Sequence, residues 1–372
     1  MNVRRMAAIA TTVIAALAVS ENNCLAGAGV SAAARAVTEV PCGKPLSAVR
    51  PPAGGVVALK RGCTYDGSLA ITADNVTVTA RGSGPAPVVE LRQDGAAINV
   101  SGSGVTIADV SLRGVAPRTW ICDGRRTPAG HVDGIDLKAG ATDNTITNVS
   151  ASGFYAGVYV PPGAARNVIE NSTFTNNKEL DTNSPARSSG AFGVLIWGDD
   201  NTVRDNTITG SQACSLAYGF DGAAVEIFGG SNNLIAGNAA SSDNTFTELG
   251  SPKGSAATSN TYLGNTVSDG AVSRGSTFLV TRGSADPDGP VHDTVVTGNT
   301  VNLTQPGDQG VVSYAWEPGD ATLLTLTNNY LNLGSNQVLY TDGGFADGGG
   351  NTYLGSCDPA IACTPTTPPL IR

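Results

Sequence analysis

The chain has few charged and few aromatic side chains, and acidic residues outnumber basic ones. Of its 372 residues, 14% are charged and 5% are aromatic, and 22 Lys and Arg stand against 31 Asp and Glu, for a net charge of −9. Nucleic acids and anionic membranes are bound through basic side chains that neutralise phosphates. Because the sequence shows no local basic patch, we expect neither partner.

Long apolar runs are missing after the first 28 residues. Arg4 and Arg5 precede an apolar stretch at residues 6–19, and small residues follow up to Ala28. This stretch is shorter than the roughly 20 residues that span a bilayer, and the order of features is typical of a secretory signal peptide. We predict that residues 1–28 are removed and that the mature protein is secreted, with no membrane segment.

Histidine is scarce, and cysteine is used sparingly. With only two histidines, a histidine-rich metal site or a Ser-His-Asp triad is not expected. Loss of Cys24 with the signal peptide would leave an even number of cysteines, which is typical of disulfides in an oxidising compartment. The spacing favours Cys42–Cys63 and Cys357–Cys363, which leaves Cys122–Cys214, although other pairings are compatible with the sequence.

Glycine is abundant, with 47 residues, and an asparagine motif recurs. The motif is Asn-Thr followed by an apolar residue, at Asn144, Asn201, Asn206, Asn244, Asn260, Asn265, Asn299 and Asn351. Residues 201–208 and 260–267 match position for position, and corresponding asparagines stand at positions 206, 238, 265, 299 and 329. This unequal but recurrent spacing predicts a solenoid whose coils carry loops of different length.

Each repeat unit alternates short β-branched stretches with turns rich in Asn and Gly. The apolar period of two predicts strands, and Asn and Gly tolerate the left-handed backbone of tight corners. Identical asparagines stacked coil upon coil can form a hydrogen-bonded ladder. The pattern resembles the right-handed parallel β-helix of the pectin-lyase-like superfamily. This resemblance implies an all-β, single-stranded solenoid of about ten coils.

The resemblance also divides the chain. We predict a signal peptide at residues 1–28, an N-terminal linker and cap at 29–67, the β-helix at 68–354 and a C-terminal disulfide tail at 355–372. The rungs of the first strand are predicted near Ala70, Asn99, Asp136, Tyr159, Leu195, Glu226, Thr247, Leu279, Ser313 and Leu339. In this register the side chains that point inward include Ile135, Leu137, Val158, Val160, Val194, Ile196, Val225 and Ile227.

Outward-facing residues of the middle coils have the composition of a sugar-binding groove. Aromatic faces stack on pyranose rings, and carboxylates accept hydrogen bonds from hydroxyls. Insertions at residues 115–130, 177–190 and 211–222 precede first strands and are placed to wall this face. The groove residues are Asp136 and Lys138, then Tyr159 one rung on, Trp197 two rungs on, and Glu226 and Phe228 three rungs on. For Trp197, packing against a loop is the alternative interpretation.

Glycoside hydrolysis needs two carboxyl groups, about 5–5.5 Å apart for retention or about 6.5–9.5 Å apart for inversion. Glu226 is the first candidate, and Glu248 belongs to the next rung. If Glu248 points outward the two lie near the retaining distance, whereas strict alternation from Phe246 would turn Glu248 inward. Arg282, one rung further, is a candidate for binding substrate or for an ion pair with Glu248.

A second constellation follows His131 and suggests a polyuronate lyase. Lys138 would remove the proton next to the substrate carboxylate, and Ca²⁺ held by Asp133 or Asp136 would stabilise the resulting charge. An ordinary surface pair between Lys138 and Asp136 is the simpler interpretation. Only this alternative involves a cofactor.

The motifs of characterised superfamily members are largely missing. The chain has no Asn-Thr-Asp, Gly-His-Gly and Arg-x-Lys set like that of polygalacturonases, and no Trp-x-Asp-His like that of pectate lyases. Roles are therefore not transferred from those families. We expect a secreted polysaccharide-binding protein, a monomer or a trimer, in which hydrolysis is preferred over Ca²⁺-assisted elimination. A non-catalytic glycan-binding solenoid is the third possibility, because one fold hosts many functions.

Overall fold

The computed structural model describes residues 35–115, 132–181, 190–215, 219–271, 275–281, 289–313, 324–341 and 345–357. The predicted signal peptide lies outside these ranges, as do Cys122 and Cys363. The described residues belong to one compact unit that begins at Arg35. Within them, no helix has the length and apolar character needed to cross a membrane.

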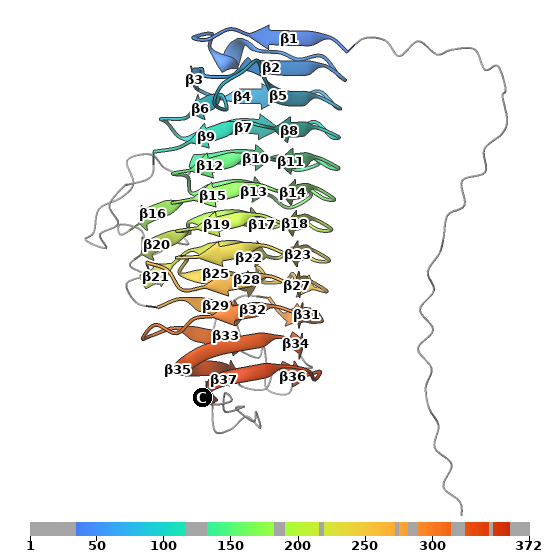
Figure 1. The fold of residues 1–372 in the computed structure, drawn as a ribbon. Helices are drawn as coiled ribbons and strands as arrows, with labels where there is room; N and C mark the ends of the chain where they lie inside the picture. The colour runs from blue at the N-terminus through green and yellow to red at the C-terminus, as the bar shows by residue number, and fades with distance from the viewer. Residues whose placement is uncertain are drawn as a thin grey trace, which may run out of the picture. The chain divides into compact units, whose positions relative to one another are not determined.

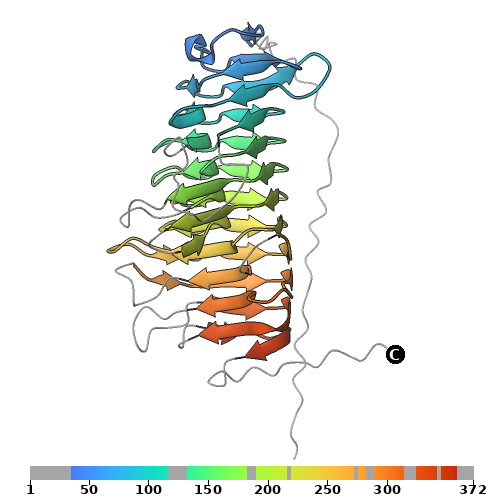
Figure 2. The ribbon, with the colours of Figure 1, turned by 90° about the vertical axis from the view of Figure 1, so that its left-hand side faces the viewer.

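The unit is a parallel β-helix with its coils stacked along one axis (Figures 1 and 2), and most coils contribute three strands. One coil consists of β10 (Val132–Leu137), β11 (Thr145–Thr147) and β12 (Ser150–Ser152). The chain then returns to β13 (Ala156–Val160), which pairs in parallel with β10. Repetition of this path stacks the strands into three rows, which confirms the predicted fold class.

The first row holds the longest strands of most coils. Its members are β4 (Leu69–Ile71), β7 (Gly95–Val100), β10, β13, β17 (Phe192–Ile196), β22 (Ala223–Phe228), β25 (Thr245–Gly250), β29 (Thr277–Thr281), β33 (Gln309–Ser313) and the second half of β35 (Tyr330–Thr341). This row agrees with the predicted number of about ten coils.

The second and third rows hold shorter strands. The second row is β1 (Val37–Val40), β2 (Val56–Lys60), β5 (Thr77–Arg81), β8 (Thr106–Ala108), β11, β14 (Val168–Glu170), β18 (Thr202–Arg204), β23 (Leu234–Ala236), β27 (Thr261–Leu263), β31 (Thr294–Thr297), β34 (Leu324–Thr327) and β36 (Phe345–Asp347). The third row is β3 (Thr64–Asp66), β6 (Val88–Glu90), β9 (Ser111–Arg113), β12, β15 (Thr173–Thr175), β19 (Thr207–Thr209), β24 (Ala239–Ser241), β28 (Thr266–Ser268), β32 (Thr300–Asn302), the first half of β35 and β37 (Thr352–Cys357).

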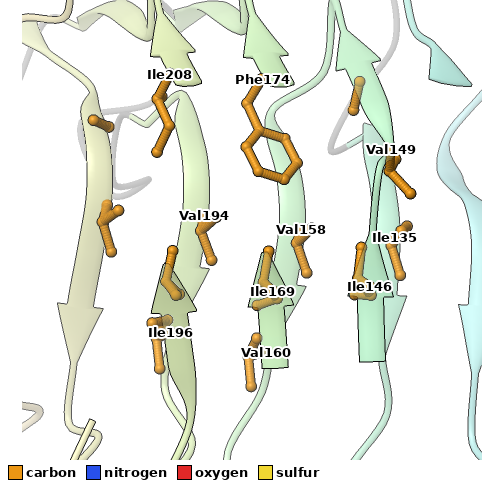
Figure 3. Packing of buried hydrophobic residues seen from close by; sticks show 14 of the residues in the cluster. Ile135, Ile146, Val149, Val158, Val160, Ile169, Phe174, Val194, Ile196 and Ile208 are labelled. Atoms are coloured by element: carbon orange, nitrogen blue, oxygen red, sulfur yellow. The ribbon is translucent and has the colours of Figure 1, made fainter. Parts of the chain in front are cut away.

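The core is a set of apolar columns inside the coil. Ile135, Val158 and Val194 lie side by side on adjacent strands of the first row, and Ile146 and Ile169 face them from the second (Figure 3). All eight side chains predicted to point inward are fully buried, which confirms that part of the register. Burial of one such side chain contributes about 1.5–3 kcal/mol, so the columns are the main source of stability.

The corners use residues that accept a left-handed backbone. Asn148 and Asn171, at successive corners between the second and third rows, have φ of 51° and 49°. The second and third rows are joined by only two residues at each of these corners, so such a conformation is needed to turn the chain. The prediction of Asn at corners is confirmed.

Two ladders of buried asparagines run along the corners. The first contains Asn144, Asn167, Asn201, Asn233 and Asn260, and the second contains Asn206, Asn238, Asn265, Asn299, Asn329 and Asn351. In each step an amide Nδ2–H and a backbone N–H both donate to the Oδ1 of the next coil's asparagine, as for Asn206 and Asn238 at 3.0 Å. The predicted ladder is confirmed, and it satisfies corner backbone groups that would otherwise be buried without partners.

Disulfides close the ends. Cys42 and Cys63 are bonded, as predicted: Cys42 lies between β1 and the short 3-10 helix η1 (Leu46–Ala48), and Cys63 lies between β2 and β3. Cys357 is also disulfide-bonded, while its predicted partner Cys363 lies outside the described residues. The predicted pair Cys122–Cys214 is not described.

Candidate functional site

One outward column runs the length of the first row. Its Cα partners are, in order, Ala70, Asn99, Asp136, Tyr159, Leu195, Glu226, Glu248, Val280, Val312 and Tyr340. The first six are the predicted rung centres. From the seventh rung on, the outward residue is displaced by one position from the predicted centre, and the centres predicted there point inward.

A bend in the first-row strands explains the displacement. On β25, Phe246 faces the interior, where its ring lies 5.6 Å from that of Phe278 and 6.3 Å from that of Tyr262. Thr247 also faces the interior, because its Oγ1 donates a hydrogen bond to the Tyr262 hydroxyl at 2.8 Å. Two successive inward residues reverse the alternation, so Glu248 points outward between inward-facing Thr247 and Leu249.

Earlier strands make the same bend with glycine. On β13 a Cβ added to Gly157 would lie 2.5 Å from a ring carbon of Phe174 and 2.6 Å from the Gly193 carbonyl oxygen, so no side chain fits. With glycine at this position, the next outward residue, Tyr159, stays in the predicted register. On β25 and β29 bulky residues replace the glycine, so counting alternate residues along the sequence does not reveal the bend.

Glu226 and Glu248 are direct Cα partners on adjacent strands β22 and β25. Paired strands lie about 4.8 Å apart, so the two carboxyl groups start from points close to the retaining separation of about 5–5.5 Å. Their residues are only 7% and 8% exposed, respectively. Leu195 precedes them and Val280 follows them in the column, so apolar side chains bracket the pair.

A polar pair lies inside the coil, directly behind the two glutamates. Tyr262 comes from β27 of the second row and reaches Thr247, which is the neighbour of Glu248 in the chain. Burial raises the pKa of the Tyr262 phenol, and the negative charge of Glu226 adds to that shift. The second-row residues in line with Tyr262 are Val203, Ile235 and Val296, all of them β-branched. A tyrosine in a column of β-branched residues is the signal by which an alignment of the repeats could have identified Tyr262.

Aromatic side chains lie along the same face. The Trp197 and Phe228 rings contact edge to face, with centroids 4.7 Å apart. Trp197 and Tyr159 also pack against a small apolar cluster that includes Phe192 and Leu195 on the outside of the coil. Three of the four predicted substrate-binding residues are therefore on one surface. Arg282, the fourth, lies outside the described residues.

Asp133, Asp136, Lys138 and Tyr159 form a second cluster, nearer the N-terminal end of the row. Lys138 Nζ is ion-paired with Asp136 Oδ2. Burial raises the pKa of Asp133 to about 8, and the charge of Asp136 acts in the same direction. Burial also raises the pKa of Tyr159, helped by both aspartates. The raised pKa favours the protonated form of Asp133, and in that form it is a poor calcium ligand.

A metal site is not assembled by the described part of the chain: no group of three or more His, Cys, Asp or Glu side chains is placed to hold an ion there. The predicted calcium site would have to rely on Asp133, whose pKa is raised, and on Asp136, which is paired with Lys138. His131, which begins this motif, is outside the described residues.

Two of the three predicted wall insertions pair with each other. Strand β16 (Lys178–Asp181) from one insertion runs parallel to β20 (Gln212–Ser215) from the next, and β20 forms a hairpin with β21 (Gly219–Asp221). They leave the stack together beside the middle coils (Figure 1). Strand β16 precedes β17, which Trp197 follows directly, and β21 precedes β22, which contains Glu226. The third insertion is outside the described residues except for Val115.

Comparison with known proteins supports the architecture. A sequence model of a known family, described as the right handed beta helix region, matches residues 96–354, which is more than half of the chain. A search of curated proteins gave no match.

Several solved structures share the fold. The crystal structure of Dettilon tailspike protein has a TM-score of 0.56 and 15% identity, with 82% of this chain and 62% of that chain covered. The alginate lyase from Paenibacillus sp. str. FPU-7 has a TM-score of 0.51 and 16% identity, with 76% and 90% covered. The tailspike protein of E. coli bacteriophage HK620 in complex with pentasaccharide has a TM-score of 0.54 and 12% identity, with 87% and 58% covered. This chain thus spans less than two thirds of either tailspike chain.

Proposed function

This chain belongs to the right-handed beta helix family, and from that premise we propose that it is a secreted protein that binds a polysaccharide along the outer face of its first row and hydrolyses the glycosidic bonds. The observation that carries the proposal is the registered pair Glu226 and Glu248 on adjacent strands. The aromatic surface of Tyr159, Trp197 and Phe228 continues from that pair along the face and suits stacking on sugar rings.

The separation of the pair favours a retaining mechanism. Glu226 donates a proton to the glycosidic oxygen as the bond to the anomeric carbon breaks, and the Glu248 carboxylate attacks that carbon to form a covalent intermediate. Water then displaces Glu248 while Glu226 accepts the proton of the water. The hydrogen bond from Thr247 to Tyr262 supports this arrangement, because it holds the strand of Glu248 from behind.

Other features agree with the proposal. The similar structures include an alginate lyase and a tailspike crystallised with a pentasaccharide, so related folds act on saccharides or bind them. The Cys42–Cys63 disulfide and the disulfide-bonded Cys357 suit an oxidising, extracellular compartment. A monomer and a trimer are both compatible with this function.

Elimination from a polyuronate is the alternative that the Asp133–Lys138 motif suggests. Its base, Lys138, is ion-paired with Asp136, and burial raises the pKa of Asp133, which disfavours the carboxylate that would hold Ca²⁺. Both features weaken a calcium-assisted lyase. The hydrolase is therefore the better supported activity, and a glycan-binding solenoid without catalysis is the remaining alternative.

The deciding experiment compares Glu226→Gln and Glu248→Gln with the unmodified protein on a panel of neutral and uronic polysaccharides, with and without Ca²⁺. Release of reducing ends should fall about 100- to 10,000-fold in either variant, because each loses a group that acts on the reacting atoms. Glu170→Gln is the matched control, since Glu170 is on the second row and paired with Arg204. New ultraviolet absorbance from unsaturated ends that is sensitive to chelators and survives in Glu226→Gln would overturn the proposal in favour of the lyase.

A further inference from the structure

A polar cavity of about 290 Å³ lies at the corner between the second and third rows, on different strands from the glutamate pair. Its polar lining is formed by Arg61, Asp109, Asn148, Ser150, Asn171 and Thr173. Four of these residues, Asn148, Ser150, Asn171 and Thr173, are exposed, so their side chains are available to a ligand from solvent.

Three lining residues occupy the same corner in successive coils. Asp109, Asn148 and Asn171 all have a left-handed backbone, with φ of 61°, 51° and 49°. Since stacked coils are about 4.8 Å apart, their side chains form a short polar column with that spacing. Asn148 Nδ2 donates a hydrogen bond to Asp109 Oδ1, which orients its amide within the column.

The same corner is built both with and without a polar side chain. Asp205 and Asn328 also have a left-handed backbone there, with φ of 56° and 55°, whereas Gly237, Gly264 and Gly298 between them have φ of 62°, 63° and 65°. A left-handed corner in this fold therefore does not need an asparagine side chain. Asn148 and Asn171 thus place side-chain amides beside the cavity at corners that glycine could also build, so both amides can be removed without loss of the corner conformation.

The remaining lining residues complete a set of mixed donors and acceptors. Ser150 and Thr173 are Cα partners that begin β12 and β15 and present hydroxyls at the rim. Arg61 adds a positively charged side chain to the lining, and Asp109 adds a negatively charged one. An anion would meet the Asp109 carboxylate and a cation would meet Arg61, so the lining favours an uncharged ligand that both donates and accepts hydrogen bonds.

We propose that this cavity is a second saccharide-binding site, which holds an uncharged sugar unit of the polysaccharide away from the hydrolytic face. Sugar hydroxyls donate and accept at neighbouring positions, as this lining requires. The inference rests on the proposed function for the identity of the ligand, but not for the site itself. Such a site keeps the enzyme on a polymer while the first-row face acts on it.

The test replaces the two amides without disturbing the corners. Asn148→Gly and Asn171→Gly are combined in the Glu226→Gln protein, so that no polymer is cut during the measurement. Glycine accepts the left-handed conformation, as Gly237 and Gly264 do. Asp205→Gly in the same background is the control, because Asp205 is the next corner in the column and lies outside the cavity lining. Retention is measured by affinity electrophoresis in gels that contain neutral polysaccharides from the panel.

The double variant should bind the retained polysaccharide about 10-fold more weakly than the control, as expected for two lost hydrogen bonds of about 0.5–1.5 kcal/mol each. In the background with Glu226 intact, cleavage of soluble oligosaccharides should be unchanged. Equal retention of the double variant and the control would overturn the inference, as would no retention of any protein. Loss of cleavage in Glu226→Gln tests the proposed function separately, so the two can fail independently.

Discussion

Asp243 is a buried carboxyl group at the corner that joins the third row to the first. Its Oδ1 accepts a hydrogen bond from the Ser211 backbone N–H at 2.7 Å. Burial raises its pKa from 3.8 to about 7. The folded protein therefore binds this proton more tightly than the unfolded chain, and the associated stability, complete below about pH 4, is lost as the pH rises through about 7.

Asp243→Asn should remove this dependence. The amide keeps the oxygen that Ser211 uses and cannot ionise, and an asparagine already serves the equivalent corner, where Phe154 N–H donates to Asn177 Oδ1. We expect the variant to exceed the unmodified protein in unfolding free energy at pH 8 and to gain much less at pH 4. Urea unfolding at both pH values measures the difference. A gain of the same size at both would show that the charge of Asp243 is not its cause.

Tyr262→Phe tests the polar pair behind the glutamates. Loss of the phenol hydroxyl leaves the Thr247 hydroxyl without its acceptor inside an apolar core, which should cost about 1–3 kcal/mol of unfolding free energy. The double variant Tyr262→Phe with Thr247→Val should recover part of that loss, because neither partner then remains unsatisfied. A double-mutant cycle gives the coupling energy. Strictly additive effects would contradict a direct interaction.

At the scale of elements, we expect the loss of unfolding free energy on removing an asparagine to depend on its position in the second ladder. The Asn238 side chain accepts two hydrogen bonds from Asn206, and its amide donates one to Asn265 and one to the Val203 carbonyl. Asn238→Ala leaves several buried groups unpaired and should destabilise the protein by roughly 2–4 kcal/mol. Asn351→Ala, at the partly exposed end of the ladder, should cost about 1 kcal/mol.

Thermal unfolding of the two variants tests this ordering. Both variants remove the same side chain from the same ladder. The difference between their losses of stability therefore reports the position in the ladder, and the variant at the end serves as the control for the variant in the interior. Equal losses at Asn238 and Asn351 would mean that the ladder does not act through burial of its hydrogen bonds.

The same elements show what sequence reasoning could and could not reach. The repeated Asn-Thr motif predicted the ladders because each asparagine performs the same local task in every coil. Alternation also predicted the inward set from Ile135 to Ile227. It could not settle Glu248, because the bend that places Phe246 and Thr247 inward is marked by glycine on β13 and by bulky residues on β25.

At the scale of the whole molecule, the fold was predictable and the site only partly so. Repeat spacing specifies neighbouring coils, and through them the surface shared by Asp136, Tyr159 and Glu226. Burial depends on what covers that surface, which periodicity does not report. Glu226 was expected on an outward strand beside walling insertions, but alternation gave no measure of its burial, and its residue is only 7% exposed. The cavity beside Asn148 was likewise missed, since its residues read as ordinary corners.

The two-residue corner between the second and third rows carries the longer asparagine ladder and accepts no extra residues in the coils from β8 to β35. Insertions such as β16 and the β20–β21 hairpin leave instead from the corner before the first row. The molecule is therefore divided into a part that tolerates insertions and a part that does not. Both natural variation and protein engineering can graft, lengthen or exchange recognition segments beside the first row, while the coils that support these segments keep the same geometry.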